Sequence, residues 1–449
     1  MRLLALTARL PYPPDRGDRL RAYHFLRTLS REHEITLLSF IAEEREREHI
    51  APLRKICARV EVIHLPAWRS VINVALNLWR PLPLQSLYYR SGEMQALVNR
   101  VLSETRFDAV YVHLFRMAQF VDGERWTVDG GQQTTNDGLR TTDRGRRTTD
   151  DRLRTTDNRP PNHPTNQLPD YRTTQLPDYR ILDLTDVISK EITRSLPYRG
   201  LLSRWLYAIE RPRIERYEDL LARTFEEIWL ISPADRAELA RRVPQSNIRL
   251  VTNGVDTEKL QPTGEPPRPD SLLFVGHMSV FHNMDAAELL AREILPLVRR
   301  EIPQASLTLV GADPHPKIQA LESMEGVHVA GFVPDLNAAL NQAAVFVAPL
   351  RFAAGVQNKV LEAMAAGRPV VTTSIVNEGI RAEPGTHLLL ADTPAETASQ
   401  VVRLLRDPAL SARLGQAARA FVRERFSWEG AARRLRAIAS RRSPRGTVS

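Results

Sequence analysis

The chain has 449 residues, 43% of them hydrophobic and 26% charged, which is typical of a globular protein with room for two or three domains. Its net charge of +9 favours an anionic partner, but we expect no nucleic acid, because the sequence has no zinc-finger spacing, aromatic RNA-binding motif or dense basic recognition helix. The single cysteine, Cys57, excludes internal disulfides, and no apolar run approaches the ~20 residues that span a bilayer. We therefore expect a cytoplasmic protein, at most peripheral on the inner face of the plasma membrane.

The first part of the chain alternates strand and helix patterns. We predict strands at residues 3–8, 35–40, 60–65 and 109–113, and helices at 19–30 and 93–104. Strands separated by helices indicate a parallel sheet with helices on both faces. The segment L-P-Y-P-P-D-R-G-D-R-L-R is a Pro-rich turn that leads into Gly17 and the first helix. Backbone donors at Gly17 and at the helix start would face a ligand at the end of the first strand.

The pattern then breaks into tandem repeats. From residue 134 the chain repeats short units that begin T-T-D or T-T-N, followed by two copies of an eight-residue unit that ends Q-L-P-D-Y-R at Arg180. These units have almost no apolar content and cannot bury enough surface to offset the entropy of ordering. We predict that residues 127–180 are a disordered insert in a surface loop; a polyvalent binding arm is the alternative.

Strand and helix patterns resume at residue 181. We predict strands at 181–184, 227–232 and 248–252, a helix within 205–225, and a second helix, P-A-D-R, that Ser232 caps. Beyond a linker at 256–270, we predict strands at 271–275, 306–310, 327–330, 345–349, 369–373 and 387–390, with helices at 285–300, 336–342 and 358–366. The fold class is therefore α/β, with doubly wound domains at 1–255 and 271–426 that face a central cleft. Residues 427–449 form a final helix and a basic tail, which could lie against anionic phospholipid.

The most informative segment is N-K-V-L-E-A-M-A-A-G-R-P-V-V, from Asn358 onwards. It predicts a short helix closed by Gly367, after a strand and a flexible loop that contains Gly355. A helix N-terminus behind such a loop is an anion site, and Lys359 adds a cation in the first turn. Glu362, one turn on, is placed to hold a ribose diol. The arrangement suits a nucleotide diphosphate.

These motifs resemble the signature helix of family 4 retaining glycosyltransferases of the GT-B fold. The strings G-V-Q-N-K-V-L-E-A-M-A and Y-P-P-D-R-G-D-R look most like the sugar transferases of bacterial exopolysaccharide and exosortase (PEP-CTERM) systems. The resemblance covers nearly all of the chain outside the insert. It implies transfer of a sugar, with retention, from a nucleotide-diphosphate sugar to a glycan or lipid-diphosphate-linked acceptor in cell-surface polysaccharide biosynthesis. The N-terminal domain would then bind the acceptor and the C-terminal domain the nucleotide sugar.

The resemblance also implies roles for individual residues. Lys359 would stabilise the developing diphosphate charge, Glu362 would hold the ribose, and His113, at the end of its strand, is a further catalytic candidate. The other expected donor-binding residues are Gly17, Gly276, His277, His282, Asn283, Gly355, Val356 and Asn358. Asp183 and Asp186, in L-D-L-T-D, are candidates for orienting the acceptor or the transferred sugar. No His/Cys/carboxylate cluster has metal-ligand spacing, so we expect no metal and no cofactor.

One position departs from the family pattern. The pattern has two glutamates, one eight positions before the other, and Ala354 stands where the first would be. Backbone amides around Gly355 and Val356 could hold the sugar instead, or the donor could differ. Two alternatives therefore stay open: a non-catalytic GT-B scaffold of a polysaccharide assembly complex, and a GT-B nucleotide-sugar epimerase, which would need acid/base carboxylates near the sugar.

Overall fold

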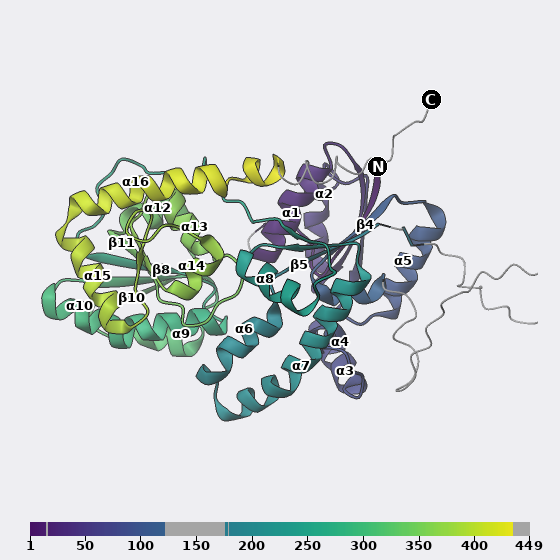
Figure 1. The fold of residues 1–449 in the computed structure, drawn as a ribbon, viewed down its shortest axis with the longest axis horizontal. Helices are drawn as coiled ribbons and strands as arrows, with labels where there is room; N and C mark the ends of the chain where they lie inside the picture. Colours follow the sequence, from purple (N-terminus) through teal and green to yellow (C-terminus); the bar gives the residue numbers. More distant parts are fainter. Residues whose placement is uncertain (15–16, 122–175, 178, 434–449) are drawn as a thin grey trace, which may run out of the picture.

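The structure is a computed structural model, and it describes residues 1–14, 17–121, 176–177 and 179–433. Two parallel β-sheets lie side by side, each covered by helices on both faces (Figure 1). The seven-stranded sheet has the order β3-β2-β1-β4-β5-β6-β7 and consists of β1 (Arg2–Thr7), β2 (Glu34–Ile41), β3 (Arg59–His64), β4 (Ala109–His113), β5 (Arg180–Thr185), β6 (Glu227–Leu230) and β7 (Ile248–Leu250). The prediction of an α/β fold with two doubly wound parallel sheets is confirmed.

The second sheet has six strands in the order β10-β9-β8-β11-β12-β13. These are β8 (Ser271–Val275), β9 (Ser306–Val310), β10 (Val327–Gly331), β11 (Val345–Ala348), β12 (Val370–Thr372) and β13 (Leu389–Leu390). Residues 251–270 connect the two sheets. In each sheet the strand order reverses direction beside the first strand, between β1 and β4 and between β8 and β11. Ligands of open α/β sheets bind at the carboxyl ends of the strands beside such a reversal.

Helices fill the crossovers between the parallel strands. Those of the first half are α1 (Gly17–Leu29), α2 (Ile50–Leu53), α3 (Ala67–Asn77), α4 (Leu84–Tyr88), α5 (Gly92–Glu104), α6 (Ile188–Ser195), α7 (Leu201–Thr224) and α8 (Pro233–Arg242). Those of the second half are α9 (Phe281–Leu289), α10 (Leu295–Glu301), α11 (Pro316–Gln319), α12 (Leu336–Gln342), α13 (Asn358–Ala365), α14 (Ser374–Ile380), α15 (Pro394–Arg406) and α16 (Pro408–Arg425). Ser232 caps α8 as predicted, accepting from the backbone amides of Ala234 and Asp235.

Several predicted boundaries differ from the structure, and two of them are wrong for a physical reason. The helix expected at 285–300 begins at Phe281 and is interrupted by a π-helical turn, Leu290–Ile294, because Pro296 at the start of α10 has no N–H to continue the ladder. The predicted insert ended at Arg180, but Arg180 begins β5 and Leu176 packs against the core of the first sheet. Most of the predicted insert, and the basic tail beyond residue 433, lie outside the described residues.

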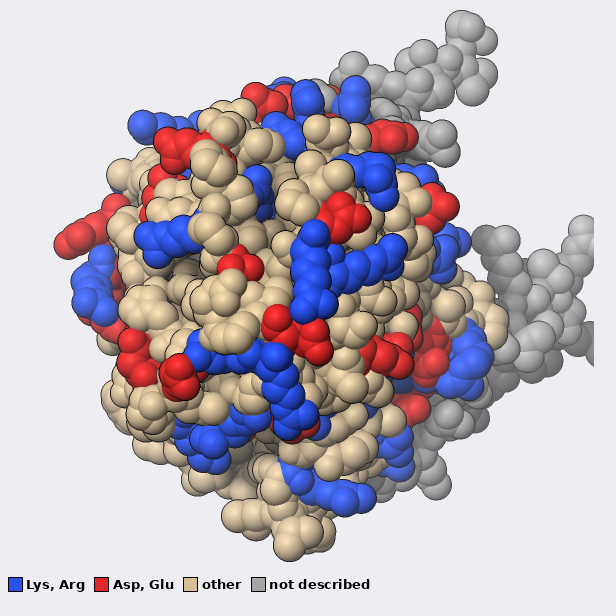
Figure 2. Space-filling view, turned by 90° about the vertical axis from the view of Figure 1, so that its left-hand side faces the viewer, with Lys and Arg blue, Asp and Glu red and all other residues tan. Residues whose placement is uncertain are grey.

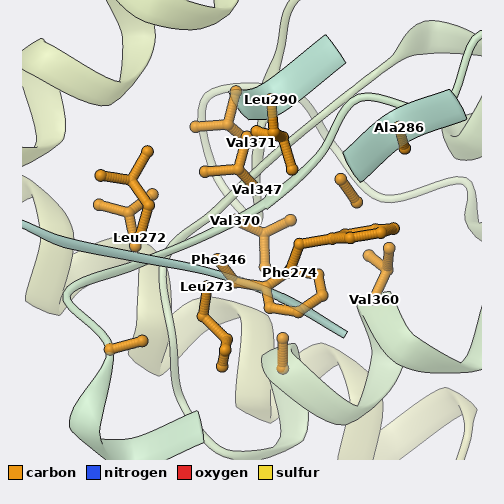
Figure 3. Close-up of a cluster of buried hydrophobic side chains, with 14 of the residues drawn as sticks. Leu272, Leu273, Phe274, Ala286, Leu290, Phe346, Val347, Val360, Val370 and Val371 are labelled. Carbon is orange, nitrogen blue, oxygen red and sulfur yellow. The ribbon is translucent and has the colours of Figure 1, made fainter. Parts of the chain in front are cut away.

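The core of the second half forms where α13 packs on the sheet. Phe274 of β8 and Val360 of α13 are fully buried in one apolar cluster, part of which is drawn in Figure 3. Burial of a side chain of this size contributes about 1.5–3 kcal/mol, so the cluster fixes α13 against the carboxyl ends of β8 and β11. Gly367 ends the helix with a left-handed backbone (φ +70), as predicted.

The end of the chain returns to the first half. Helix α16 runs along the second half toward the first (Figure 1), and Trp428 beyond it stacks on His24 of α1 with ring centroids 4.0 Å apart. A bridge between Val255 and Ser427 joins the same region to the connection between the sheets. The two halves are therefore tied together at a second place besides the connection.

Candidate functional site

The first turn of α13 presents a cation that is held by two amide oxygens. Nζ of Lys359 donates hydrogen bonds to Oδ1 of Asn283 (2.6 Å) and to Oε1 of Gln357 (3.2 Å), and it lies 5.8 Å from the ring centroid of Phe274. Burial lowers the pKa of Lys359 to about 8, against the opposing charges of Glu362 and Glu191. No side chain caps the start of α13. The first N–H groups of the helix and the amine of Lys359 therefore form a site where an anion can bind.

Glu362 follows one turn later. Its carboxylate makes no hydrogen bond within the described part of the chain, although the residue is half-buried. Burial raises the pKa of Glu362, and the nearby charge of Lys359 partly offsets this. A half-buried carboxylate with free acceptor positions suits a ligand that brings hydroxyl donors.

The loop after β8 positions the amine of Lys359 through a hydrogen bond from Lys359 to Asn283. Gly276 has no side chain, and a Cβ there would lie 2.8 Å from Cγ of Asn283, so only glycine lets this amide sit against the loop. Asn283 is buried; its Nδ2 donates to the carbonyl of His277 (3.0 Å) and its Oδ1 accepts from Lys359. Oδ1 of Asn283 thus positions Lys359. Nδ2 keeps a second N–H, and the role of Asn283 as a donor to the ligand stays a prediction.

The two histidines of this loop have different neighbours. Nδ1 of His277 lies 2.9 Å from Oγ of Ser279. Nδ1 of His282 lies 3.6 Å from Oε1 of Glu191 on α6, across the junction of the two halves. Burial lowers the pKa of His282; the pKa of Glu191 is also lowered, because the contact with His282 outweighs the effect of burial. His282 therefore contacts the other half of the molecule.

In the first half, Asp183 is the centre of a buried network. Its carboxylate accepts a bidentate pair from Arg21 at 2.8 to 3.0 Å and a further hydrogen bond from the Tyr111 hydroxyl at 2.7 Å. Asp183 is fully buried, and its pKa lies below its usual range, because Arg21 and then His113 outweigh the effect of burial. In this structure its oxygens hold α1, β4 and β5 together, and the orienting role of Asp183 stays a prediction.

His113 belongs to the same network. Its Nδ1 lies 3.2 Å from Asp183 and its Nε2 lies 3.1 Å from the carbonyl of Asp18, in the first turn of α1. The side chain is buried, and neither ring nitrogen is left for a ligand. In this arrangement His113 positions the start of α1, and its direct catalytic role stays a prediction.

Asp186, at the end of β5, faces the second half directly. A Cβ on Gly355 would lie 1.8 Å from Oδ1 of Asp186, and this oxygen is buried without a hydrogen-bond partner among the described residues. Burial, reinforced by the negative charges of Asp235 and Glu191, holds the pKa of Asp186 well above its usual range. An unpartnered buried oxygen of this kind is costly unless a ligand supplies the missing partner.

The Gly355 loop is held from the first half. The Gly355 amide donates to Oδ2 of Asp235 (2.9 Å), whose other oxygen accepts from Lys190 (3.0 Å). Arg194 donates to the carbonyl of Ala353 (3.1 Å). In this arrangement Asp235 accepts from the Gly355 amide, and the binding of a sugar by the amides around Gly355 and Val356 stays a prediction. Val356 follows as a buried residue.

A chain of polar contacts reaches the first residue of α13. Arg21 donates to Oδ1 of Asn253 (2.8 Å), and Nδ2 of Asn253 donates to Oδ1 of Asn358 (3.1 Å). Gly17 lies on the other side, where a Cβ would be 3.8 Å from Nδ2 of Asn358. The structure thus brings Gly17 and Asn358 together, and both strand-order reversals meet at one junction.

The residues that form the polar contacts at the junction between the two halves were not predicted from the sequence. They are Arg21, Lys190, Glu191, Arg194, Asp235 and Asn253. Asp235 and Asn253 do follow predicted strands closely, which was a usable signal. In the part of the chain that the structure describes, no group of three or more His, Cys, Asp or Glu side chains is arranged to hold a metal ion. Nor is any described helix long and apolar enough to cross a bilayer.

Residues 269–407 match the family described as glycosyl transferases group 1. This segment contains β8 to β13 and the whole α13 site. No curated protein matches the chain. The matched family therefore covers the half of the molecule that carries Lys359 and Glu362.

Solved structures share the whole fold. Sucrose-phosphate synthase from Thermosynechococcus elongatus is 15% identical, with a TM-score of 0.63 and 98% of each chain covered. HepE from Anabaena, in complex with UDP-glucose, is 14% identical with a TM-score of 0.61, over 98% of this chain and 100% of that one. TarM from S. aureus, in complex with Fondaparinux, alpha-GlcNAc-glycerol and UDP, is 11% identical with a TM-score of 0.61, over 97% and 99%. At these identities the likeness establishes the GT-B fold.

Proposed function

We propose that this chain is a glycosyltransferase that moves a sugar from a nucleotide-diphosphate sugar to a glycan or lipid-diphosphate-linked acceptor, with retention, in cell-surface polysaccharide biosynthesis. The observation that carries the proposal is the pair formed by Lys359 and Glu362. A desolvated amine stands at the uncapped start of α13 and a free carboxylate stands one turn away, within the segment that matches glycosyl transferases group 1. Neighbours of the same fold that hold UDP and UDP-glucose support a nucleotide sugar as the donor.

The diphosphate binds at the start of α13. The first N–H groups of the helix and Nζ of Lys359 stabilise the negative charge that develops as the sugar leaves. Asn283 fixes the amine at that place through its 2.6 Å hydrogen bond. This arrangement supplies the stabilisation without a metal ion, and we propose that the reaction is metal-independent.

The nucleoside ribose binds at Glu362. Its two hydroxyl groups donate to the carboxylate, which has no partner of its own in the described structure. The charge of Lys359 partly offsets the effect of burial, which raises the pKa of Glu362, and so supports the ionised, acceptor form.

The transferred sugar lies beside the Gly355 loop. Ala354 leaves no carboxylate on this loop, and Oδ1 of Asp186 approaches the same loop from the opposite half. The acceptor hydroxyl attacks from the face of the departing phosphate, and a phosphate oxygen takes its proton, so the step requires no dedicated base.

The test is nucleotide release from a panel of UDP-, GDP- and ADP-sugars in the presence of EDTA. We expect slow hydrolysis of at least one donor, and its loss in Lys359→Ala and Glu362→Ala. Analysis of the sugar product separates transfer or hydrolysis from epimerisation. Binding of each donor is followed by thermal shift in parallel; failure of every donor to bind would contradict the proposal and favour a non-catalytic scaffold.

A further inference from the structure

Two helices of the first half expose large apolar side chains on the outside of the molecule. On α3 and the turn after it, Trp68, Leu76 and Trp79 are 64%, 69% and 76% exposed, and Val71, Ile72 and Leu78 are also exposed. At the start of α7, Leu201, Leu202 and Trp205 are 87%, 83% and 66% exposed, and Leu206 and Ile209 follow. Exposed apolar side chains in such number on neighbouring elements indicate an interaction surface.

Helix α3 is amphipathic with its polar side facing inward. Ser70 is fully buried, and Nδ2 of Asn73 donates to the carbonyl of Arg90 at 2.7 Å. The exposed positions Trp68, Ile72 and Leu76 recur every four residues on the other side. A helix that only covered a sheet would bury its apolar side chains against that sheet. Because the apolar side of α3 faces outward, we expect it to contact a second apolar surface.

Helix α7 projects beyond the core at its N-terminal end. None of its first nine residues, 201–209, is buried, and burial begins at Glu210. Leu201, Trp205 and Ile209 are four residues apart and form one stripe, to which Leu202 and Leu206 add width. This half of α7 therefore contributes little to the core.

The two helices adjoin each other. A guanidinium nitrogen of Arg213 on α7 lies 3.5 Å from the carbonyl of Leu78, and Oε1 of Glu210 accepts from the amide of Leu84 at 2.5 Å. Both helices stand at the lower edge of the first half in Figure 1, and the lower end of the molecule in Figure 2 is mostly uncharged, with Lys or Arg beside it. We call the exposed apolar side chains of α3, its following turn and the start of α7 the α3/α7 face.

The charged side chains within the segments that form the α3/α7 face are arginines, one of which, Arg69, pairs with Glu93 of α5 at 2.9 Å. Residues 67–80 and 192–209 contain no Asp or Glu, whereas Arg69, Arg80, Arg199 and Arg204 lie within them. Arg80 lies over the Trp79 ring at 4.7 Å, and Arg199 over the Tyr207 ring at 3.8 Å, so these arginines cover apolar surface while keeping their charge. Apolar and aromatic side chains rimmed by arginine match an anionic bilayer surface.

We propose that the α3/α7 face seats the protein on an anionic phospholipid bilayer. The apolar side chains enter the boundary between headgroups and acyl chains, and the arginines contact the phosphates. Because no described helix is long enough to span a bilayer, the contact is peripheral. The face is distinct from the α13 site, and vesicle binding requires neither a donor nor an acceptor, so this inference stands or falls separately from the proposed function.

The face begins beside the candidate site. Tyr198, just before α7, stacks on Phe352 of the loop after β11 with ring centroids 5.2 Å apart. Arg194, near the end of α6 and four residues before Tyr198, donates a hydrogen bond to the carbonyl of Ala353 in the same loop. A bilayer on the α3/α7 face therefore lies next to the loop where we place the transferred sugar, as a lipid-borne acceptor requires.

The test is flotation of the purified full chain with vesicles of phosphatidylcholine, with and without phosphatidylglycerol. We expect binding that phosphatidylglycerol strengthens and added salt weakens. Leu201→Glu with Leu202→Glu, or Trp79→Glu alone, should weaken binding by at least about tenfold, since each places a charge where an apolar group is to be buried. These side chains are so exposed that the variants should keep the melting temperature of the parent.

The matched control is Phe332→Glu, because Phe332 is 74% exposed but lies in the second half, after β10. It should bind vesicles as the parent does. Arg204→Gln should reduce only the response to phosphatidylglycerol. Absence of vesicle binding by the parent, or equal losses in Phe332→Glu and Leu202→Glu, would overturn the proposal. A parent oligomer that Leu202→Glu converts to monomer, without any vesicle binding, would also overturn it and identify the face as a contact between copies.

Discussion

Oδ1 of Asn283 accepts a hydrogen bond from Nζ of Lys359 at 2.6 Å, and this contact joins the loop after β8 to the first turn of α13. Gly276 leaves the space that Asn283 occupies. The loop after one strand thereby positions the cation that belongs to the helix after another. Without Asn283 the lysine amine would keep Gln357 as its hydrogen-bond partner and lose its fixed direction.

The first prediction follows from this contact. Lys359→Ala should lower kcat for donor turnover by about 10²- to 10³-fold, the usual effect of removing a group that stabilises a leaving anion. Asn283→Ala should lower kcat/KM by at least about tenfold, because the amine remains but is misplaced. Lys317→Ala, at an exposed position of α11, is the matched control and should change neither constant. Unchanged turnover in Asn283→Ala would contradict the positioning role.

The second prediction is a pH dependence. Burial lowers the pKa of Lys359 to about 8, and under the proposed function the charged amine is the form that binds the diphosphate. The charged fraction of the free enzyme therefore falls above this pH, and kcat/KM for the donor should decrease about tenfold per unit there. The arginine of Lys359→Arg stays charged over this pH range, so the kcat/KM that this variant retains should not decrease above about pH 8. A profile for the parent that stays flat to about pH 10 would contradict the assignment.

Strand and helix periodicity was sufficient to predict most of the fold. Both sheets are parallel and buried, so their strands form near-continuous apolar runs such as Ser271–Val275, which the structure reproduces to the residue. Helix α3 was not predicted, and its orientation could not have been, since a sequence shows the two sides of an amphipathic helix but not which side meets the core. The structure turns Ser70 inward and Trp68 outward.

The α13 site was predictable because its parts are local. Gly355, Lys359 and Glu362 lie within eight positions, and helix geometry brings them together. The roles of Asp183 and Asp186 were not predictable, because they depend on partners far away in the sequence. The register of β5 sets Asp183 beside His113, and Arg21 reaches it from α1, whereas Asp186 extends beyond the strand to the second half.

The third prediction concerns Gly355, which has a left-handed backbone (φ +64). Gly355→Ala should lower stability by the cost of that backbone for an alanine, about 1–2 kcal/mol, plus the clash of its Cβ with Asp186 at 1.8 Å. Gly385→Ala is the matched control, since Gly385 also has a positive φ (+78) but a Cβ there would meet no atom within 4 Å. Urea denaturation should show a larger loss for Gly355→Ala, and Asp186→Ala should recover part of it. Equal losses at the two glycines would contradict the close approach.

The fourth prediction places the boundary of the repeat-rich segment. The Tyr179 hydroxyl donates to Glu227 (2.7 Å), and Arg180 holds Glu226 through its backbone amide (2.8 Å) and its guanidinium (3.0 Å). Each such hydrogen bond is worth about 1 kcal/mol, and those that involve a charged group are worth more. Replacing residues 127–175 by a short Gly/Ser loop should leave the melting temperature nearly unchanged. Extending the replacement to residue 180 should lower it by several degrees.

The matched pair of replacements separates two explanations. Both shorten the chain by a similar length, so their loop-closure entropies are nearly equal and only the contacts of residues 176–180 differ. Arg180→Ala in the full chain should reproduce part of the loss, since it removes the guanidinium contacts but leaves the backbone of β5 in place. If both replacements lowered the melting temperature equally, contacts formed by residues 127–175 would have to be stabilising the fold, and the predicted boundary would be wrong.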